Sequence, residues 1–222
     1  MKDRVRTACL LLALTLTAGS ANGQVTGIPV YNNGVPGGLG IAGDIGFSND
    51  DAGDGTAYAG TLRLGLGLIG VTGTISGFNP DGPAGTDVSV GGTLNYRLLG
   101  GPLVPLNVTL QGGIAYAKPD DGILPGQDVK DYRFPVGIGF ALVIPNPALA
   151  IRPWLAPRLD IHRVSATVGS FTDTNFGLSG GIELNFLNGF GLHAAYDRVF
   201  ADSGDPGVFG VGAHYGLRIP GL

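Results

Sequence analysis

The chain has 222 residues, of which 41 are glycine and 14% are charged, and its mean hydropathy is +0.27. Soluble domains usually hold about 25% charged residues, so this composition disfavours an ordinary soluble protein. Beyond the first residues no apolar run reaches about 18 residues, which excludes ordinary membrane-spanning helices. The formal charge of −4 and the lack of a basic stripe exclude nucleic acid as an expected partner.

Residues 1–23 have the composition of a secretory signal peptide. Basic residues at the start precede an apolar stretch from Ala8 to Ala18, and small residues then lead to a cut after Gly23 or after Ala21. The apolar stretch is too short to span a membrane. The only cysteine, Cys9, leaves with this segment, so the mature chain has no disulfide and no thiolate site. The mature chain keeps 10 basic and 16 acidic residues, which gives it a net charge of −6.

From about residue 37 onward, apolar side chains alternate with polar or small ones, which is typical of a strand with two unlike faces. In the first segment Leu39, Ile41, Ile45 and Phe47 share one face, and Asp44 lies on the other. The pattern recurs in ten segments: 39–47, 56–66, 69–78, 88–98, 106–116, 132–142, 149–161, 176–186, 190–196 and 209–219. We therefore predict an all-β protein, an antiparallel up-and-down transmembrane β-barrel of about ten strands, with eight as the alternative count.

The connections between these segments alternate in length. Short ones fall at 67–69, 99–105, 145–148 and 187–189, and long ones at 49–55, 79–87, 118–131, 163–174 and 201–207. Short inner turns and longer outer loops are typical of a bacterial barrel. The long loops hold 12 of the 16 mature acidic residues, which predicts a negative outer rim.

Three features favour a membrane barrel over a soluble secreted β-barrel that binds a ligand. No charged residue occupies the apolar register, where arginine or lysine would cost about 2–4 kcal/mol at the bilayer midplane, and no lysine occupies the polar register. Aromatic residues gather at strand ends, as interfacial girdles require. Those expected near the long loops are Phe47, Tyr58, Phe78, Tyr116, Tyr132, Phe134, Phe176 and Phe209, and those near the short turns are Tyr96, Phe186, Phe190 and Tyr215.

Two runs, P-W-L-A-P-R-L at 153–159 and G-L-S-G-G-I-E-L-N-F at 177–186, resemble the small outer-membrane β-barrel superfamily of the porin-like and OmpA/OmpX-like kind. Gly212, Tyr215 and Leu217 resemble its terminal assembly signal, although the chain ends R-I-P-G-L where members often end on an aromatic residue. The resemblance covers nearly all of the mature domain, 24–222. It implies an outer-membrane location, contact with membrane lipid and insertion by the barrel assembly machinery, and it specifies no activity.

The polar register places ionisable side chains inside the barrel, where they must pair or line water. The lumen-lining residues expected are Asp44, Arg63, Arg97, Arg133, Arg152, Arg158, Asp160, His162, Glu183, His193, Asp197, His214 and Arg218. Six arginines against four acids predict about two excess positive charges in the lumen. Side chains can fill a barrel of this size, but inward residues such as Gly91, Gly137 and Gly139 are expected to leave room for water.

Three prolines fall within the expected strands. Pro135 lies in the sixth segment, and Pro153 and Pro157 lie in the seventh. Because proline cannot donate a hydrogen bond to a neighbouring strand, we expect bulges or irregular pairing there.

The leading functional hypothesis is a non-enzymatic outer-membrane barrel with a structural or surface-interaction role, which also passes small solutes through a narrow pore. One alternative is an anion-preferring porin, and another is the soluble binding protein. A third is a surface hydrolase, because Asp160 and His162 resemble the Asp-x-His pair of omptin proteases; only Asp81 or Asp87 would supply the further acid. No nucleophile, metal-ligand or phosphate-loop motif appears, so we expect no cofactor and no metal. An extracellular ligand is not specified.

Overall fold

The structure, a computed structural model, describes residues 24–81, 85–101, 104–118, 129–167, 169–202 and 204–217. These residues form strands, the turns and loops that join them, and a short 3-10 helix, η1, at Asp50–Ala52. The strands are β1 (Gly38–Ser48), β2 (Gly55–Leu66), β3 (Ile69–Pro80), β4 (Asp87–Gly101), β5 (Val104–Lys118), β6 (Lys130–Leu142), β7 (Ile144–Pro145), β8 (Leu149–Ala166), β9 (Gly169–Phe186), β10 (Phe190–Phe200) and β11 (Gly207–Leu217). Across the same residues, no helix has the length and apolar character needed to cross a membrane.

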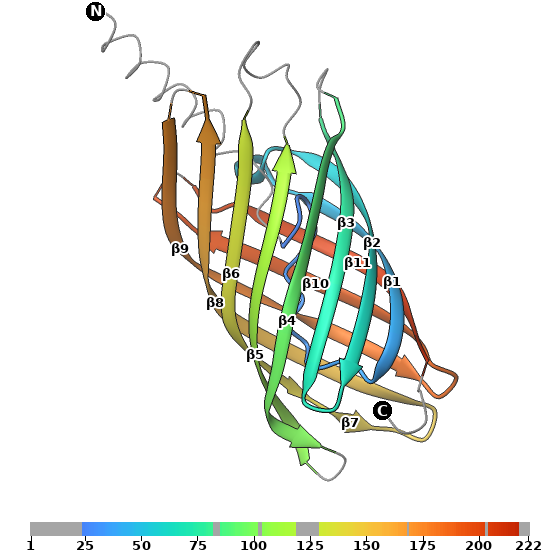
Figure 1. Cartoon of the computed structure of the whole chain (residues 1–222). Coiled ribbons are helices and arrows are strands. Elements are labelled where there is room, and N and C mark those ends of the chain that lie inside the picture. The colour runs from blue at the N-terminus through green and yellow to red at the C-terminus, as the bar shows by residue number, and fades with distance from the viewer. Residues whose placement is uncertain are drawn as a thin grey trace, which may run out of the picture.

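Ten of these strands close into one antiparallel ring (Figure 1). Strands that follow one another in the chain pair in the ring, β6 pairs with β8, and β1 pairs with β11 to join the two ends of the sheet. β7 has two residues and pairs with the start of β8. Closure matters in lipid, because lipid offers no hydrogen-bond partner to the backbone of an open sheet edge. The predicted ten-stranded barrel is therefore confirmed, and the alternative count of eight is wrong.

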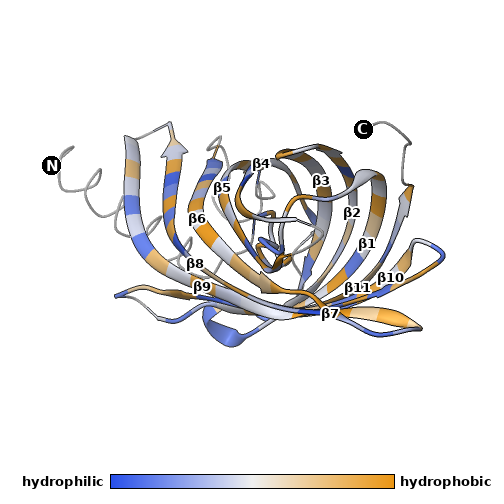
Figure 2. Cartoon of the chain, turned by 90° about the horizontal axis from the view of Figure 1, so that it is seen from below, coloured by the Kyte–Doolittle hydropathy of each residue, from blue (hydrophilic) through white to orange (hydrophobic). Residues whose placement is uncertain are grey.

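The distribution of polarity is the reverse of that in a soluble protein. Every strand of the ring exposes large apolar side chains, for example Ile41 at 55%, Leu62 at 64% and Leu94 at 59% relative exposure. Charged side chains such as Arg158 and Asp197 are instead buried in the lumen. Figure 2 shows hydrophobic and hydrophilic residues alternating along the strands. An apolar exterior of this extent requires lipid as its solvent, so the barrel is a transmembrane one, as predicted.

β8 and β9 are longer than predicted, with 18 residues each. The loop expected at 163–174 is wrong, because β8 continues to Ala166 and pairs across a tight turn with Gly169 of β9. Residues 169–172 are exposed, so this hairpin extends beyond the apolar belt into water. Val164 and Thr172 are good strand formers, which lets the two arms continue as a ladder without burial on either face.

The strand prolines interrupt pairing without shifting the register. The β5–β6 ladder lapses beside Pro135 and the β6–β8 ladder lapses beside Pro157, and each resumes in the same register. Pro153 lies in an unbroken stretch of the β8–β9 ladder. On its other side, the pairing of β8 lapses beside Pro153, between Ala141↔Trp154 and Ile144↔Ile151, so the prediction of bulges or irregular pairing is confirmed at all three prolines. The register shifts instead lie between Arg97 and Gly101, in the β4–β5 hairpin.

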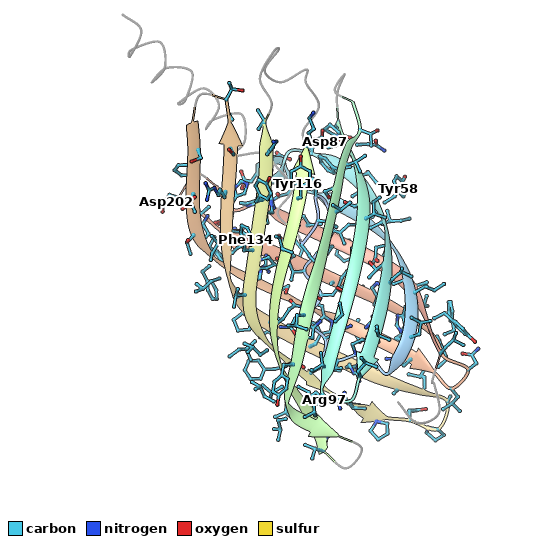
Figure 3. All side chains as sticks on the ribbon, viewed as in Figure 1. Tyr58, Asp87, Arg97, Tyr116, Phe134 and Asp202 are labelled. Carbon is cyan, nitrogen blue, oxygen red and sulfur yellow. The ribbon has the colours of Figure 1, made fainter. Side chains whose placement is uncertain are left out.

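One residue of the predicted aromatic girdles faces the other way. Phe78, near the end of β3, is 4% exposed and packs inside the barrel against Val25, Ile28 and Ala57. Phe78 lies in the inward-facing register of β3. Its position in the alternation, and not its closeness to the strand end, therefore determines that its side chain faces the lumen. Tyr58, by contrast, points outward near the long-loop end (Figure 3).

Candidate functional site

The lumen of the barrel is filled by the chain's own N-terminal segment. Residues 24–36, here called the plug segment, run through the inside of the ring, visible as the blue trace within the barrel in Figure 1. Residues 24–30, 32, 33 and 35 are buried. Val25 lies near the long-loop end beside Gly91, and Pro36 lies near the short-turn end beside Gly65 and Gly70. The segment therefore spans the lumen before the chain turns back into β1.

Hydrogen bonds hold the part of the plug segment nearest the long loops. The backbone N–H of Thr26 donates to Oγ of Ser89 at 2.9 Å, and Oγ of Ser76 donates to the carbonyl of Thr26 at 3.1 Å. Further along, the N–H of Val30 donates to Oδ2 of the buried carboxylate of Asp197 at 2.7 Å. A charge-assisted bond of this kind is among the stronger ones in proteins, so Asp197 is a main anchor of the segment.

Polar side chains also hold the part nearest the short turns. Nε2 of Gln111 donates to the carbonyl of Tyr31 at 2.8 Å, and Nδ2 of Asn33 donates to Oε2 of Glu183 at 2.7 Å. The Tyr31 ring packs 6.2 Å from the ring of Trp154, the only tryptophan of the chain. Contacts with six strands, β3, β4, β5, β8, β9 and β10, thus fix the segment along its length.

Inward glycines make room for the plug segment. A Cβ atom at Gly46 would meet the Gly27 carbonyl, and one at Gly65 would meet the Pro36 carbonyl. At Gly139 and Gly91 it would meet Asn32 and Val25 respectively, and at Gly137 it would meet the Arg158 side chain from the facing strand. The expectation that such positions leave room for water is therefore wrong. A residue without a side chain lets a second backbone approach the wall closely.

The charged centre of the lumen is Arg158 on β8. Its Nε lies 3.1 Å from Oδ2 of Asp160, and its Nη1 lies 2.7 Å from Oδ1 of Asp197. All three side chains are at most 5% exposed. Because Asp197 also binds the plug segment, this cluster links β8, β10 and the segment.

Two of the three mature histidines meet inside the barrel. Nδ1 of His193 and Nδ1 of His214 are 3.2 Å apart. Nε2 of His193 lies 2.6 Å from Oδ1 of Asp44, and Nε2 of His214 lies 3.3 Å from Oε1 of Glu183. The two Nδ1 atoms lie within hydrogen-bond distance, and which of them donates depends on the tautomers of the two rings. Tyr31 lies edge-on to His193 with ring centroids 5.1 Å apart.

The structure does not bring Asp160 and His162 together. His162 lies 2.7 Å from Oδ1 of Asp131 on the neighbouring strand, while Asp160 pairs with Arg158. Asp131 was expected in a loop, but it is 5% exposed and follows Lys130 at the start of β6. Arg133 is the register partner of His162, so Asp131, two residues before it on β6, is a diagonal cross-strand neighbour of His162.

The lumen is also less positive than predicted. The inward arginines described are Arg63, Arg97, Arg133, Arg152 and Arg158, and the inward acids are Asp44, Asp131, Asp160, Glu183 and Asp197. These charges balance, because Asp131 joins the set and Arg218 lies outside the described residues. Asp131 therefore removes one of the two excess positive charges predicted, and the charge of Arg218 stays outside this comparison.

Acidic residues gather at the long-loop end of the barrel. Asp50 and Asp51 open η1, which Asn49 caps, and Asp87 and Asp202 lie at the same end (Figure 3). A hydrogen bond with Asp50 raises the pKa of Asp54 above its usual value, and the negative charges of Asp50 and Asp81 raise it further. This rim is negative, as the sequence predicts. No group of three His, Cys, Asp or Glu side chains among the described residues is arranged to hold a metal ion.

The plug segment is the part of the site that sequence reasoning missed. It has no period-two or helical pattern, because its two prolines and its two glycines interrupt any such pattern. One signal was available, because no charged residue occurs in residues 24–43, ahead of Asp44. An uncharged segment with four buried aliphatic residues, Val25, Ile28, Val30 and Val35, is suited to a partly apolar interior.

No family model matches the chain, and no curated protein matches its sequence. Among solved structures, the chain is similar to the β domain of the Bordetella autotransporter BrkA, with 13% identity and a TM-score of 0.50 over 81% of this chain and 98% of that one. It is also similar to Ail, the attachment invasion locus protein of Yersinia pestis, with 17% identity and a TM-score of 0.40 over 82% of this chain and 99% of that one. The translocator domain of NalP from Neisseria meningitidis has 12% identity and a TM-score of 0.39, over 97% of this chain and 98% of that one. These likenesses are of fold.

Proposed function

We propose that this chain is an outer-membrane β-barrel whose lumen is closed by its own N-terminal segment, and that it serves as a membrane-embedded scaffold presenting its acidic loops at the cell surface. The observation that carries the proposal is the burial of residues 24–36 inside the ring. In this function the barrel is a non-enzymatic anchor and not an open pore. The outer-membrane location is supported by the secretory leader and by the apolar exterior, which a cytoplasmic or periplasmic protein would not tolerate.

The space left beside the plug segment supports a closed state. A void of about 40 Å³ separates the segment from β1, β2, β3 and β4, and its lining includes Tyr31, Asp44 and Thr74. Such a void holds a few water molecules at most, because one buried water needs about 10–15 Å³ of this kind of volume. Wall residues also hydrogen-bond the segment directly, for example Ser89 at Thr26 and Gln111 at Tyr31. A hydrated solute does not fit in this void, which is one of the spaces beside the segment.

The balance of charges also argues against an anion-selective pore. Selectivity for anions needs an excess of fixed positive charge along an aqueous path. In the described lumen each of Arg133, Arg152 and Arg158 lies near a carboxylate, and the five arginines match five acids. The scaffold hypothesis requires no such excess.

The test compares two proteins refolded without the leader, residues 24–222 and residues 37–222. We expect the longer protein to be silent in planar lipid bilayers and the shorter one to conduct, because removing residues 24–36 empties the lumen. Heat-modifiable gel mobility establishes that both barrels are folded. Stable conductance of the same size from the two folded proteins would contradict the proposal.

The same pair of proteins has an internal optical reporter. Trp154 is the only tryptophan, is 5% exposed and contacts Tyr31 of the plug segment. Its emission should shift to longer wavelength in the 37–222 protein, because water replaces the segment beside the indole. An unchanged spectrum in a folded 37–222 protein would mean that residues 24–36 do not lie where the structure has them.

A further inference from the structure

A cavity of about 350 Å³ lies at the short-turn end of the barrel, below the end of the plug segment. Val35, Pro36 and Gly37 close it on the side of the lumen. The first residues of β1 and β8 and the last residues of β9 and β11 form its sides. Pockets that bind small ligands have volumes of about 300–1,000 Å³, so this cavity has the size for a small organic molecule.

Two arginines enter the cavity from different strands. Arg63 comes from β2 and Arg152 comes from β8, and the Arg152 side chain is 25% exposed. The nearest contacts of Arg152 are long, 3.8 Å from Nη1 to Oε2 of Glu183 and 3.5 Å from Nη1 to the Asn33 carbonyl. Within the part of the chain that the structure describes, Arg63 has no ion-pair partner. Both guanidinium groups therefore have N–H donors available to a ligand.

Glu183, the acid that borders the cavity, already has partners for both of its carboxylate oxygens. Glu183 is 3% exposed in its side chain, and its Oε2 accepts a hydrogen bond from Nδ2 of Asn33 at 2.7 Å. Its Oε1 lies 3.3 Å from Nε2 of His214. Glu183 offsets one of the two arginines and has little capacity left for an amine ligand. The charge that remains open to the cavity is positive.

The rest of the cavity wall is largely apolar. Val35, Leu39, Val143 and Phe186 line it together with the two arginines, and Asn185 and His214 are its further polar side chains beside Glu183. A guanidinium group binds a carboxylate through two parallel N–H donors, and an apolar wall favours a ligand with an apolar body. The geometry points to a binding site for a small carboxylate with a compact apolar body, which enters from the short-turn side of the membrane.

The test uses benzoate, benzamide and benzylamine, which share one ring and differ in charge. Binding to the refolded 24–222 protein is measured by isothermal titration calorimetry, with protein-free micelles as the blank. Benzoate should bind at least about tenfold more tightly than benzamide, because charge-assisted hydrogen bonds are lost with the amide, and benzylamine should not bind. Equal binding of benzoate and benzamide, or no binding of benzoate, overturns the proposal.

Two variants and one control locate the site. The double substitution Arg63→Gln and Arg152→Gln should weaken benzoate binding at least about tenfold, because the two side chains that donate to the benzoate carboxylate lose their positive charge. Arg97→Gln is the matched control, since Arg97 also faces inward at the short-turn end but does not line the cavity (Figure 3). Benzoate binding that survives the double substitution, or that falls equally in the control, overturns the site.

A third variant keeps the test decisive if the double variant does not fold. Ala150 lines the cavity and is half-buried, so Ala150→Phe fills the space and leaves both arginines in place. Benzoate binding should then be lost while heat-modifiable mobility is kept. Unchanged binding in folded Ala150→Phe protein places the ligand elsewhere and overturns the proposal. Because the readout is binding, its result is independent of whether the barrel conducts.

Discussion

The carbonyl oxygen of Gly27 in the plug segment occupies the space in which a Cβ atom on Gly46 of β1 would stand. The substitution Gly46→Ala should therefore push the segment away from the wall. Overpacking of this kind costs about 1–3 kcal/mol, and the neighbouring group is backbone, which cannot rotate out of the way. We expect the variant to gain conductance in planar bilayers and to shift the emission of Trp154 to longer wavelength.

Gly60→Ala on the adjacent strand β2 is the matched control for that substitution. Nothing lies within 4 Å of the position that a Cβ atom on Gly60 would take. This variant should stay silent in bilayers and keep the wild-type emission of Trp154. If Gly46→Ala behaves like Gly60→Ala, the plug segment does not pack against β1.

Asp197 and Arg198 are adjacent on β10 but should differ widely in their contribution to stability. Asp197 is fully buried between Arg158 and the Val30 N–H, so Asp197→Ala removes one of the two carboxylates that hold the buried Arg158 guanidinium and leaves the Val30 N–H without its acceptor. Breaking a buried pair in this way costs about 3–5 kcal/mol. The free energy of unfolding, measured by urea titration in micelles with Trp154 fluorescence, should fall by about that amount.

Arg198→Ala should change the same free energy by only about 0–1 kcal/mol. The Arg198–Asp205 pair is 2.6 Å long, but its side chains are 44% and 37% exposed, so water competes for both charges. Equal losses for Asp197→Ala and Arg198→Ala would show that the lumen is hydrated and that the plug segment does not seal it.

The lipid-facing register is testable with one arginine. Leu94 is 59% exposed in the middle of β4 and faces outward, so Leu94→Arg would place a charge in hydrocarbon at a cost of about 2–4 kcal/mol. The yield of heat-modifiable barrel on refolding into lipid vesicles should fall sharply. Leu187→Arg, in a turn where the side chain is 80% exposed, should refold like the wild-type protein. Similar yields from the two variants would mean that Leu94 does not face lipid.

The orientation of the barrel can be measured by cysteine labelling, because residues 24–222 contain no cysteine. Asp202 lies at the long-loop end (Figure 3), and Asn188 lies in a short turn between β9 and β10. In intact cells, a membrane-impermeant maleimide should label Asp202→Cys and not Asn188→Cys, and both should react after lysis. The reverse pattern would place the acidic loops inside the cell envelope and contradict the scaffold function.

The sequence by itself determined the wall of this barrel. The alternation of apolar and polar residues is a local property, since each strand residue points to the side opposite its neighbours. Reading it along the chain was enough to predict ten strands, the outward positions of Ile41, Leu62 and Leu94, and the inward positions of Arg158 and Glu183. The acidic rim also followed, because loop lengths and loop composition can be read without any pairing.

Only the tertiary structure decided what the lumen contains. Residues 24–36 have no period that fixes a face, and their place depends on polar partners such as Asp197 and Glu183, far away in the chain. The partner of His162 is Asp131 because the β6–β8 register sets it, and that register is not readable from either strand alone. The role of the inward glycines is not readable from the sequence either, since the space left by a missing side chain can hold water or a second backbone equally well. At Gly46 and Gly65 closure of the ring brought the backbone of the plug segment into that space.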